Sequence, residues 1–294
     1  MTHDVIVIGG SYAGMAAALQ LLRAHRRVLI IDAGQRRNRF ATHAHGFLAQ
    51  DGVDPAQIAA TAKAQLEAYP TLTWVNGTAM QAGGTRDDFT VATADGTTYQ
   101  GRRILFATGV SDTLPQIEGL AERWGRHVFH CPYCHGYELN KGAIGVIGTG
   151  PMSVHQARLI PEWGQVTFLL NEALALDNDT RADLTARGVT IEETPITRLD
   201  GQADVVLNDG RVMSFAGLFT ASTNAPASPL AAEMGCNIVE TGFGTMIETD
   251  AGKLTSIPGV YACGDVARVP HSVTLAVADG AWAGAQIHAS LVFG

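Results

Sequence analysis

Near its N-terminus the chain reads Val5-Ile6-Val7-Ile8-Gly9-Gly10-Ser11-Tyr12-Ala13-Gly14. Four consecutive apolar residues fit a parallel strand that is buried on both faces. The glycines that follow allow a sharp turn and close approach to a pyrophosphate, which binds at the positive N-terminus of the next helix. Ala13–Arg26 has helical spacing, and Val28–Ile31 supplies a second strand, which ends at Asp32. A strand, a glycine turn, a helix, a strand and an acid in this order predict a dinucleotide-binding unit.

The same plan restarts in the middle of the chain. Ile144–Ile147 is a second apolar run, and the turn that follows it reads Gly148-Thr149-Gly150-Pro151-Met152-Ser153. Residues 154–163 have helical spacing, and Val166–Leu170 supplies the next strand. Two copies of one plan predict an α/β protein with two Rossmann-like dinucleotide-binding domains.

The remaining segments indicate how the two copies are connected. Asp54–Tyr69 reads as a helix that begins with an Asp-Pro pair, and short strands with glycine turns from Leu72 to Leu105 predict a small β-meander. A strand at Val260–Ala262 and a helix over Ser272–Ser290 complete the first copy. We therefore expect the second domain to be inserted into the first. The expected domains are residues 1–113 with 239–294, and residues 114–238.

Composition places the chain among globular proteins. It has 294 residues, of which 46% are hydrophobic and 16% are charged, so it does not have the composition of a disordered chain. A net charge of −8 argues against a nucleic-acid surface. No apolar run reaches the about 18 residues of a membrane helix, and residues 1–4 lack the basic region of a signal peptide. We expect a cytoplasmic protein that binds neither nucleic acid nor membrane.

Between the two glycine turns the chain carries Cys131-Pro132-Tyr133-Cys134. Two thiols at this spacing can form a disulfide and pass two electrons. Three other interpretations stay open: a glutaredoxin-like motif, which is typical of the start of a small fold; inert buried thiols; and a zinc site, since His127, His130 and His135 lie close by. Structural zinc usually joins two separated ligand pairs, and the sequence has no second Cys-x-x-Cys. We therefore expect a redox pair and no metal.

In their order and spacing these motifs resemble those of the low-molecular-weight thioredoxin-reductase-like flavoproteins, a group of class II pyridine nucleotide-disulfide oxidoreductases. The resemblance covers nearly the whole chain. Besides the first glycine turn and the Cys-x-x-Cys, it rests on Ala107-Thr108-Gly109 and on Gly259-Val260-Tyr261-Ala262-Cys263-Gly264-Asp265. It implies an FAD domain made from both chain ends, an NAD(P)-type domain between them that carries the Cys-x-x-Cys, and a homodimer.

By this resemblance FAD binds in the first domain. Asp32 would bind a ribose, Asp265 would bind the ribityl chain, and the start of the last helix would face the pyrimidine edge of the flavin. Ser11 stands where a middle glycine is usual, and it leaves room for phosphate while it adds a hydroxyl donor. The implied FAD-binding residues are Gly9, Ser11, Ala13, Gly14, Asp32, Thr108, Gly109, Gly264, Asp265, Ser272 and Val273.

The resemblance also assigns roles around the dithiol. Cys134 would lie nearest the flavin, and Cys131 would react with the substrate. Thioredoxin reductases carry an aspartate directly after the second cysteine, whereas this chain has His135, with Glu138 three residues later. An imidazole titrates near neutrality and suits proton transfer with a thiol, so we expect His135 to be the acid–base residue and His271 to be a second candidate. The Cys-x-x-Cys-His-Gly run resembles the branch of the family that oxidises small-molecule dithiols.

The second glycine turn departs from the family pattern. Gly148 and Gly150 are in place, but Pro151 and Met152 are bulky beside the turn. NADPH-specific relatives carry a His-Arg-Arg cluster after the next strand, where positive charge meets the 2′-phosphate. Residues 171–172 here are Asn-Glu, and the carboxylate would repel that phosphate. NADPH is therefore an unfavourable ligand, while NADH binding and a vestigial site both stay open.

These features predict an FAD-dependent thiol-disulfide oxidoreductase, and the direction of electron flow separates two hypotheses. A dithiol oxidase would take electrons from a small dithiol through Cys131/Cys134 and FAD to O2. A reductase would use NAD(P)H to reduce a thioredoxin-like protein or a small disulfide. The missing basic cluster and His135 favour the oxidase. A third hypothesis, a redox sensor without turnover, has no recognisable partner surface in the sequence.

Overall fold

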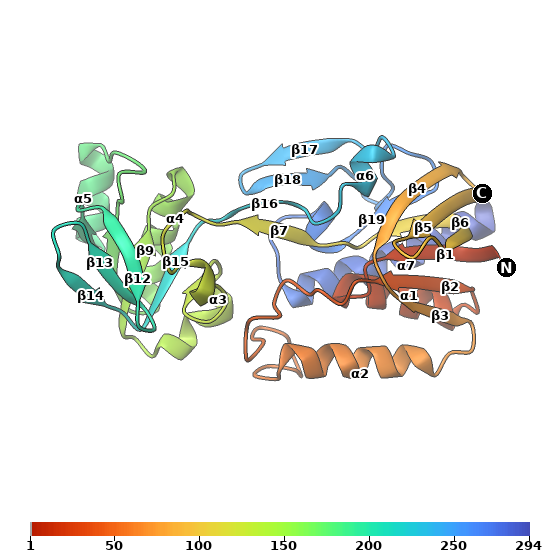
Figure 1. The fold of residues 1–294 in the computed structure, drawn as a ribbon, viewed down its shortest axis with the longest axis horizontal. Helices are drawn as coiled ribbons and strands as arrows, with labels where there is room; N and C mark the ends of the chain where they lie inside the picture. Colours follow the sequence, from red (N-terminus) through yellow and green to blue (C-terminus); the bar gives the residue numbers. More distant parts are fainter. Residues whose placement is uncertain (1) are drawn as a thin grey trace. The chain divides into compact units, whose positions relative to one another are not determined.

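The computed structural model describes residues 2–294, and their contacts divide the chain into two compact units (Figure 1). The first unit contains the chain up to Arg39, Phe47–Ser111 and Asn224–Gly294. The second contains Phe40–Gly46 and Asp112–Thr223. The chain leaves the first unit and returns to it, which confirms the insertion that the sequence predicts.

A parallel sheet forms the centre of the first unit, and its strands are the expected apolar runs. In the order in which they lie side by side, they are β3 (Leu72–Asn76), β2 (Val28–Asp32), β1 (Thr2–Ile8), β6 (Thr98–Phe106) and β19 (Val260–Ala262). The helices along one side of the sheet are α1 (Tyr12–Arg23), α2 (Pro55–Glu67) and α7 (Val273–Phe293) (Figure 1). Because the sheet is covered, Val5, Ile6 and Val7 are completely buried.

The predicted β-meander is smaller than expected. β4 (Ala79–Thr85) and β5 (Asp88–Thr93) pair antiparallel, and β5 pairs with the first half of β6. β3 lies outside this meander, since it pairs parallel with β2 after the α2 crossover. The second half of β6 joins the parallel sheet, where Ile104 is the register partner of both Ile6 and Val260.

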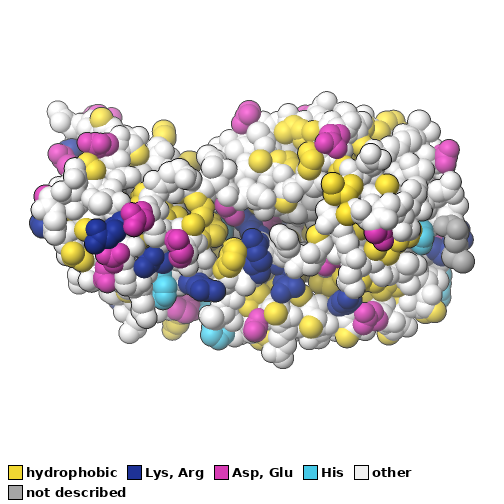
Figure 2. Space-filling view, viewed as in Figure 1, with side chains coloured by type: hydrophobic (Ala, Val, Ile, Leu, Met, Phe, Trp, Pro, Cys, Tyr) yellow, Lys and Arg dark blue, Asp and Glu magenta, His cyan; other side chains and the backbone are white. Residues whose placement is uncertain are grey.

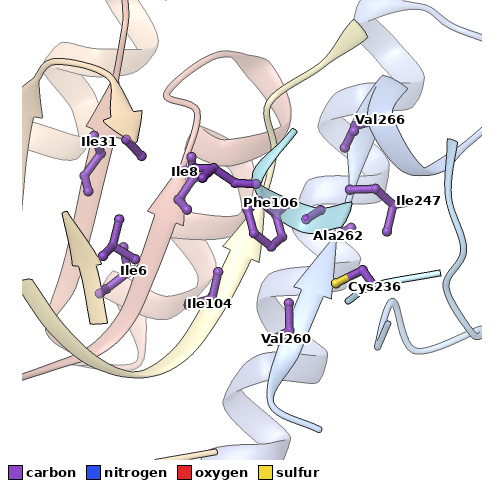
Figure 3. Close-up of a cluster of buried hydrophobic side chains, with 14 of the residues drawn as sticks. Ile6, Ile8, Ile31, Ile104, Phe106, Cys236, Ile247, Val260, Ala262 and Val266 are labelled. Atoms are coloured by element: carbon purple, nitrogen blue, oxygen red, sulfur yellow. The ribbon is translucent and has the colours of Figure 1, made fainter. Parts of the chain in front are cut away.

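The core of the first unit corrects the predicted domain boundary. Cys236 and Ile247 pack with Phe106 and with residues of β1, β2 and β19 in one buried cluster (Figure 3). The chain therefore returns to the first unit at Asn224, and not at residue 239, because the segment after it buries apolar side chains there. Four strands around this boundary form one sheet, in the order β17 (Ile238–Thr241), β18 (Gly244–Ile247), β16 (Thr223–Pro226), β7 (Val110–Thr113). The short helix α6 (Leu230–Glu233) follows β16 in the chain.

The second unit repeats the parallel plan, as predicted. Its main sheet has the order β11 (Thr190–Glu192), β10 (Gln165–Leu169), β9 (Ala143–Ile147), β15 (Gly217–Thr220), β8 (Val128–Phe129). A smaller antiparallel sheet contains β12 (Ile196–Asp200), β13 (Asp204–Leu207) and β14 (Val212–Ser214). The helices are α3 (Pro132–His135), α4 (Pro151–Leu159) and α5 (Asn178–Ala186). No helix within residues 2–294 combines the length and the apolar character that crossing a membrane requires.

Candidate functional site

The first glycine turn, residues 9–14, is packed too closely for larger side chains at two positions. Gly9 has φ +105°, and a Cβ on it would collide with the carbonyl oxygen of Ala107 at the end of β6. A Cβ on Gly14 would collide with the carbonyl oxygen of Gly9. Ser11 is the N-cap of α1, but its side chain makes no capping hydrogen bond. The first N–H groups of α1 are therefore left to an anion such as a pyrophosphate.

Asp32 lies at the end of β2, next to this turn. Its Oδ1 accepts a hydrogen bond from the Gly10 amide at 3.1 Å. Gly10 has no room for a side chain, since a Cβ on it would lie 2.8 Å from both Asp32 and the Trp74 ring. Thr108 and Gly109 follow β6, and Gly109 has φ +68°. The structure thus fixes a carboxylate where a dinucleotide fold binds a ribose hydroxyl.

The Gly264-Asp265 loop packs against the start of α1. Gly264 has φ +76°, and a Cβ on it would come within 2.6 Å of the Ala13 Cβ. The Gly264 amide donates to Asp279 Oδ2 at 2.8 Å, and Asp279 Oδ1 pairs with Lys253 at 2.7 Å. Asp279 therefore fixes the loop, a role that the motifs do not reveal. The sequence gives one indication of this role, since Asp279 is the only Asp or Glu in α7, which also contains no Lys or Arg.

Several buried polar atoms of the first unit have no hydrogen-bond partner among the described residues. Asp265 Oδ2 lies 3.4 Å from Arg37 Nη1, whereas Asp265 Oδ1 is buried and unsatisfied. The same is true of Arg36 Nε, Asn38 Oδ1 and Arg268 Nε. An unsatisfied buried polar atom costs free energy, so a set of such donors and acceptors fits a polar ligand. FAD has hydroxyls and phosphates that match both kinds of atom, and the residues present fit it.

His271 also contacts Arg37. Its Nδ1 lies 2.8 Å from Arg37 Nη1, and because a guanidinium can only donate, this nitrogen is the acceptor. Ser272 caps α7 by accepting a hydrogen bond from the Leu275 amide at 3.1 Å, and Val273 is the first residue of the helix. His271 Nδ1 therefore carries no proton while it is bonded to Arg37, which restricts the predicted part of His271 in proton transfer.

In the second unit, one helical turn brings the two motif cysteines together. Cys131 is the N-cap of α3, and the Cys134 amide donates to the Cys131 carbonyl at 3.3 Å. The two Sγ atoms lie 2.7 Å apart, and both side chains are partly buried. Trp163 supports the turn, since its ring leaves no room for a Cβ on Gly136 and meets the Tyr133 ring edge-on at 5.2 Å. The motif thus holds both sulfurs within reach of disulfide formation.

His135 directly follows Cys134 and packs on an aromatic ring. Its imidazole stacks on Phe129, with ring centroids 4.3 Å apart and planes 18° from parallel. Burial, with a smaller contribution from the charge of His45, lowers the pKa of His135 to about 4. The imidazole is therefore neutral near neutral pH. His135 adjoins the dithiol as predicted, but this pKa disfavours it as a proton acceptor.

Glu138 pairs with His45, a histidine that lies outside the motifs and that the sequence leaves open as either a cleft or a structural residue. Glu138 Oε1 lies 3.4 Å from His45 Nε2. His45 belongs to the segment Phe40–Gly46, which packs within the second unit although the chain before and after it belongs to the first. The fold therefore places an imidazole and a carboxylate together beside the Cys-x-x-Cys turn.

The second glycine turn has the tight shape of a dinucleotide-binding turn, but two of its backbone amides donate hydrogen bonds to acceptors within the turn itself. The Thr149 amide donates to Ser153 Oγ at 2.9 Å, and the Ser153 amide donates to the Gly150 carbonyl at 2.9 Å. Pro151, the first residue of α4, has no N–H. A Cβ on Gly148 would lie 2.6 Å from the carbonyl oxygen of Leu170, so the turn is as tight as predicted. Thr149, Pro151 and Ser153 therefore offer no amide hydrogen to a pyrophosphate at the start of α4.

Several arginines of the second unit are paired with carboxylates. Figure 2 shows dark blue and magenta side chains next to one another on this unit. The pairs are Arg158 with Asp183 at 2.7 Å, Arg181 with Glu193 at 2.7 Å, and Arg211 with Glu192 at 2.8 Å. The hydrogen bond from Arg211 lowers the pKa of Glu192 to about 2. A 2′-phosphate would have to compete with carboxylates for these guanidinium groups.

Within residues 2–294, no three or more His, Cys, Asp or Glu side chains are grouped so that they could hold a metal ion. His130, one of the candidate zinc ligands, packs its ring 5.9 Å from the ring of Trp124. Cys236 and Cys263 are buried, and burial raises the pKa of both thiols. These two cysteines are therefore packing residues.

Known proteins are similar to this chain in sequence and in fold. Residues 3–280 match the pyridine nucleotide-disulphide oxidoreductase family. The chain is 31% identical to thioredoxin reductase sirT of Leptosphaeria maculans, over 97% of this chain and 93% of that protein. It is 28% identical to thioredoxin reductase tcpT of Claviceps purpurea, over 98% and 94%. The crystal structure of an oxidoreductase from Agrobacterium tumefaciens matches with a TM-score of 0.98 at 51% identity, over 100% of this chain and 99% of that one.

Proposed function

The chain belongs to the pyridine nucleotide-disulphide oxidoreductase family, and we propose that within it the protein works as a dithiol oxidase. As a thioredoxin-reductase-like member it is an FAD-dependent oxidoreductase that acts on sulfur groups. In our proposal a small dithiol donates the electrons, the Cys131/Cys134 pair receives them, and O2 is the final acceptor.

The main support for this proposal comes from the second glycine turn, residues 148–153. A reductase needs a working nicotinamide site, and backbone amides at a helix N-terminus are what binds a pyrophosphate. In this turn the Thr149 and Ser153 amides are used internally and Pro151 has none. The loop after β10 adds Glu172 in place of basic residues. These features disfavour the binding of NADPH most strongly and that of NADH as well. A dithiol substrate is therefore the better source of electrons.

We assign the thiol chemistry to the two motif cysteines. A substrate thiolate attacks Cys131 of the oxidised pair, and the Cys131–Cys134 bond breaks. The second substrate sulfur then displaces Cys131, so the substrate leaves as a disulfide and both cysteines are reduced. When bound, FAD would supply an acceptor for this electron pair that can react with O2 to give peroxide. The α3 turn contributes by holding the sulfurs 2.7 Å apart, so that the disulfide can re-form.

We further propose that FAD is held in the first unit by the first glycine turn, Asp32, the Gly264-Asp265 loop and the start of α7. The tight turn at Gly9 and Gly14 and the unsatisfied Asp265 Oδ1 support this assignment. Arg37 and Asp279 join the predicted set as residues that position the loop, because they contact Asp265 and the Gly264 amide.

A second candidate function is reduction of a thioredoxin-like protein or a small disulfide with NAD(P)H. The names of the relatives favour it, since those from L. maculans and C. purpurea are both called thioredoxin reductases. The Cys-x-x-Cys would serve this reaction equally well, with the electrons moving in the opposite direction.

Aerobic turnover separates the two functions. The FAD-loaded protein is given dithiothreitol as sole reductant, and O2 consumption and peroxide formation are recorded. In parallel it is given NADPH or NADH with oxidised thioredoxin under nitrogen. We expect peroxide in the first assay, none above background from a Cys131→Ser variant, and no thioredoxin reduction in the second. Rapid thioredoxin reduction by either nucleotide would overturn the proposal in favour of the reductase.

A further inference from the structure

A tryptophan on the edge strand of the first unit lies beside the first glycine turn. Trp74 belongs to β3, which pairs with β2, and its register partner is Ile30. A Cβ on Gly10 would lie 2.8 Å from the Cη2 and Cζ2 atoms of the Trp74 ring, and it would lie 2.8 Å from the Asp32 Cβ as well. The indole ring and the carboxylate side chain therefore border the same point of the turn.

Two contacts hold the Trp74 ring in a fixed orientation. Its Nε1 donates a hydrogen bond to Asn76 Oδ1 at 3.1 Å, and Asn76 lies two residues further along the same face of β3. The Lys63 ammonium, on α2, lies over the ring with Nζ 4.4 Å from the centroid, which is an attractive cation–π arrangement. Trp74 is only partly buried. An aromatic ring that is already oriented and still partly exposed can pack against a flat ligand at little cost in conformational entropy.

The position of this ring points to the base of a nucleotide. In a dinucleotide-binding fold, the acid at the end of the second strand hydrogen-bonds the ribose of the adenosine half, and Asp32 occupies that place. The adenine is attached to the same ribose, so it must lie within about one sugar of Asp32. Trp74 supplies an aromatic ring at this distance, and nucleobases pack favourably on aromatic side chains.

We propose that Trp74 packs against the adenine of FAD and thereby makes the first unit select FAD over FMN, which lacks the adenosine half. Lys63 and Asn76 position the ring. The inference rests on the proposed placement of FAD in the first unit and is independent of the direction of electron flow. It adds a contact to the base to the contacts that the glycine turn and Asp32 make with the pyrophosphate and the ribose.

The affinity of the full-length protein for two flavins tests this role. The flavin is removed, and the apoprotein is titrated with FAD and with FMN. We expect Trp74→Leu to weaken FAD binding by about 10- to 100-fold, as loss of an aromatic contact to a base does, and to leave the Kd for FMN unchanged. Trp74→Phe keeps a flat ring and should recover most of the lost FAD affinity. The matched control is Trp282→Leu, which replaces another tryptophan of the same unit that is 50% exposed, and it should bind both flavins like the wild type.

Three results would overturn the inference. The first is wild-type affinity for FAD in Trp74→Leu. The second is an equal loss of FAD and FMN affinity in this variant, which would show that Trp74 only supports the structure of the turn. The third is equal FAD affinity in Trp74→Leu and Trp74→Phe, because leucine fills space but has no ring to place against a base.

The same titration separates this inference from the proposed FAD site. If Asp265→Ala and Trp74→Leu both bind FAD as tightly as the wild type, the proposed site itself fails. If Asp265→Ala weakens FAD binding and Trp74→Leu does not, only the role of Trp74 fails.

Discussion

The amide of Thr149 donates a hydrogen bond to the Ser153 hydroxyl, 2.9 Å away, inside the second glycine turn. The turn has the two glycines of a dinucleotide fingerprint, yet this bond uses a donor that would otherwise point at a phosphate. Pro151 removes another donor at the start of the same helix. The second unit therefore keeps the fold of a nucleotide domain while the local chemistry disfavours the nucleotide.

This relationship predicts that pyridine nucleotides do not stabilise the protein. A ligand that binds the folded state at 100 times its Kd stabilises by about 2.7 kcal/mol, which a melting experiment detects readily. We expect NAD+ and NADP+ at millimolar concentration to leave the Tm of the FAD-loaded protein unchanged. Addition of FAD to the apoprotein is the positive control. A clear rise in Tm with either pyridine nucleotide would contradict the proposed loss of binding.

Replacement of Cys134 should separate flavin binding from turnover. Cys134→Ser removes one sulfur of the pair that lies 2.7 Å apart, so no disulfide can form and dithiol oxidation should stop, while FAD remains bound in the first unit. Cys236→Ser is the matched control, because Cys236 is a buried packing residue and its variant should retain turnover. Peroxide formation and the flavin-to-protein ratio are measured for both. Turnover by Cys134→Ser would show that the pair is not the redox relay.

Asp265 should matter for FAD affinity. Its Oδ1 is buried without a partner among the described residues, so a bound ligand hydroxyl would satisfy it. Removing one partner of a hydrogen bond to a charged group costs about 1.5–3 kcal/mol, and we expect Asp265→Ala to weaken FAD binding by about 10- to 100-fold. Asp88→Ala, an exposed acid on β5 of the same unit, should bind FAD normally. Equal affinities in a flavin titration would remove Asp265 from the site.

The Arg211–Glu192 pair should make the second unit sensitive to acid. The hydrogen bond from Arg211 lowers the pKa of Glu192 from 4.5 to about 2. A depressed carboxyl pKa contributes stability that is complete above the unfolded-state value and disappears as the pH falls through the folded-state value. The free energy of unfolding should thus fall more steeply from pH 4.5 to 2 in the wild type than in Glu192→Gln. Urea denaturation across this range measures both slopes, and identical slopes would contradict the assignment.

The elements that the sequence predicts are those whose signals are local. β2 ends at Asp32 as its apolar run indicates, and Asp54 caps α2 by accepting a hydrogen bond from the Ala56 amide at 2.6 Å. Apolar runs, glycine turns and helix caps depend on residues a few positions apart, so they can be recognised in the sequence without knowledge of the tertiary structure. The order of these elements was enough to predict two Rossmann-like units and the insertion.

The contacts that complete the site join residues far apart in the chain. Arg37 reaches Asp265, and His45 reaches Glu138, each from an irregular segment after β2. Such segments have no periodicity, so their partners depend on tertiary packing alone. The domain boundary was misplaced for a related reason, because the short strands β16 to β18 do not show in the sequence which core they cover.

The most direct test of the proposed direction of electron flow is anaerobic mixing of the FAD-loaded protein with one reductant at a time, followed by the visible absorbance of the flavin. We predict rapid and complete bleaching by dithiothreitol, loss of that bleaching in Cys134→Ser, and no bleaching by NADPH or NADH on the same time scale. Rapid bleaching by either nucleotide, with slow or absent bleaching by the dithiol, would contradict the account.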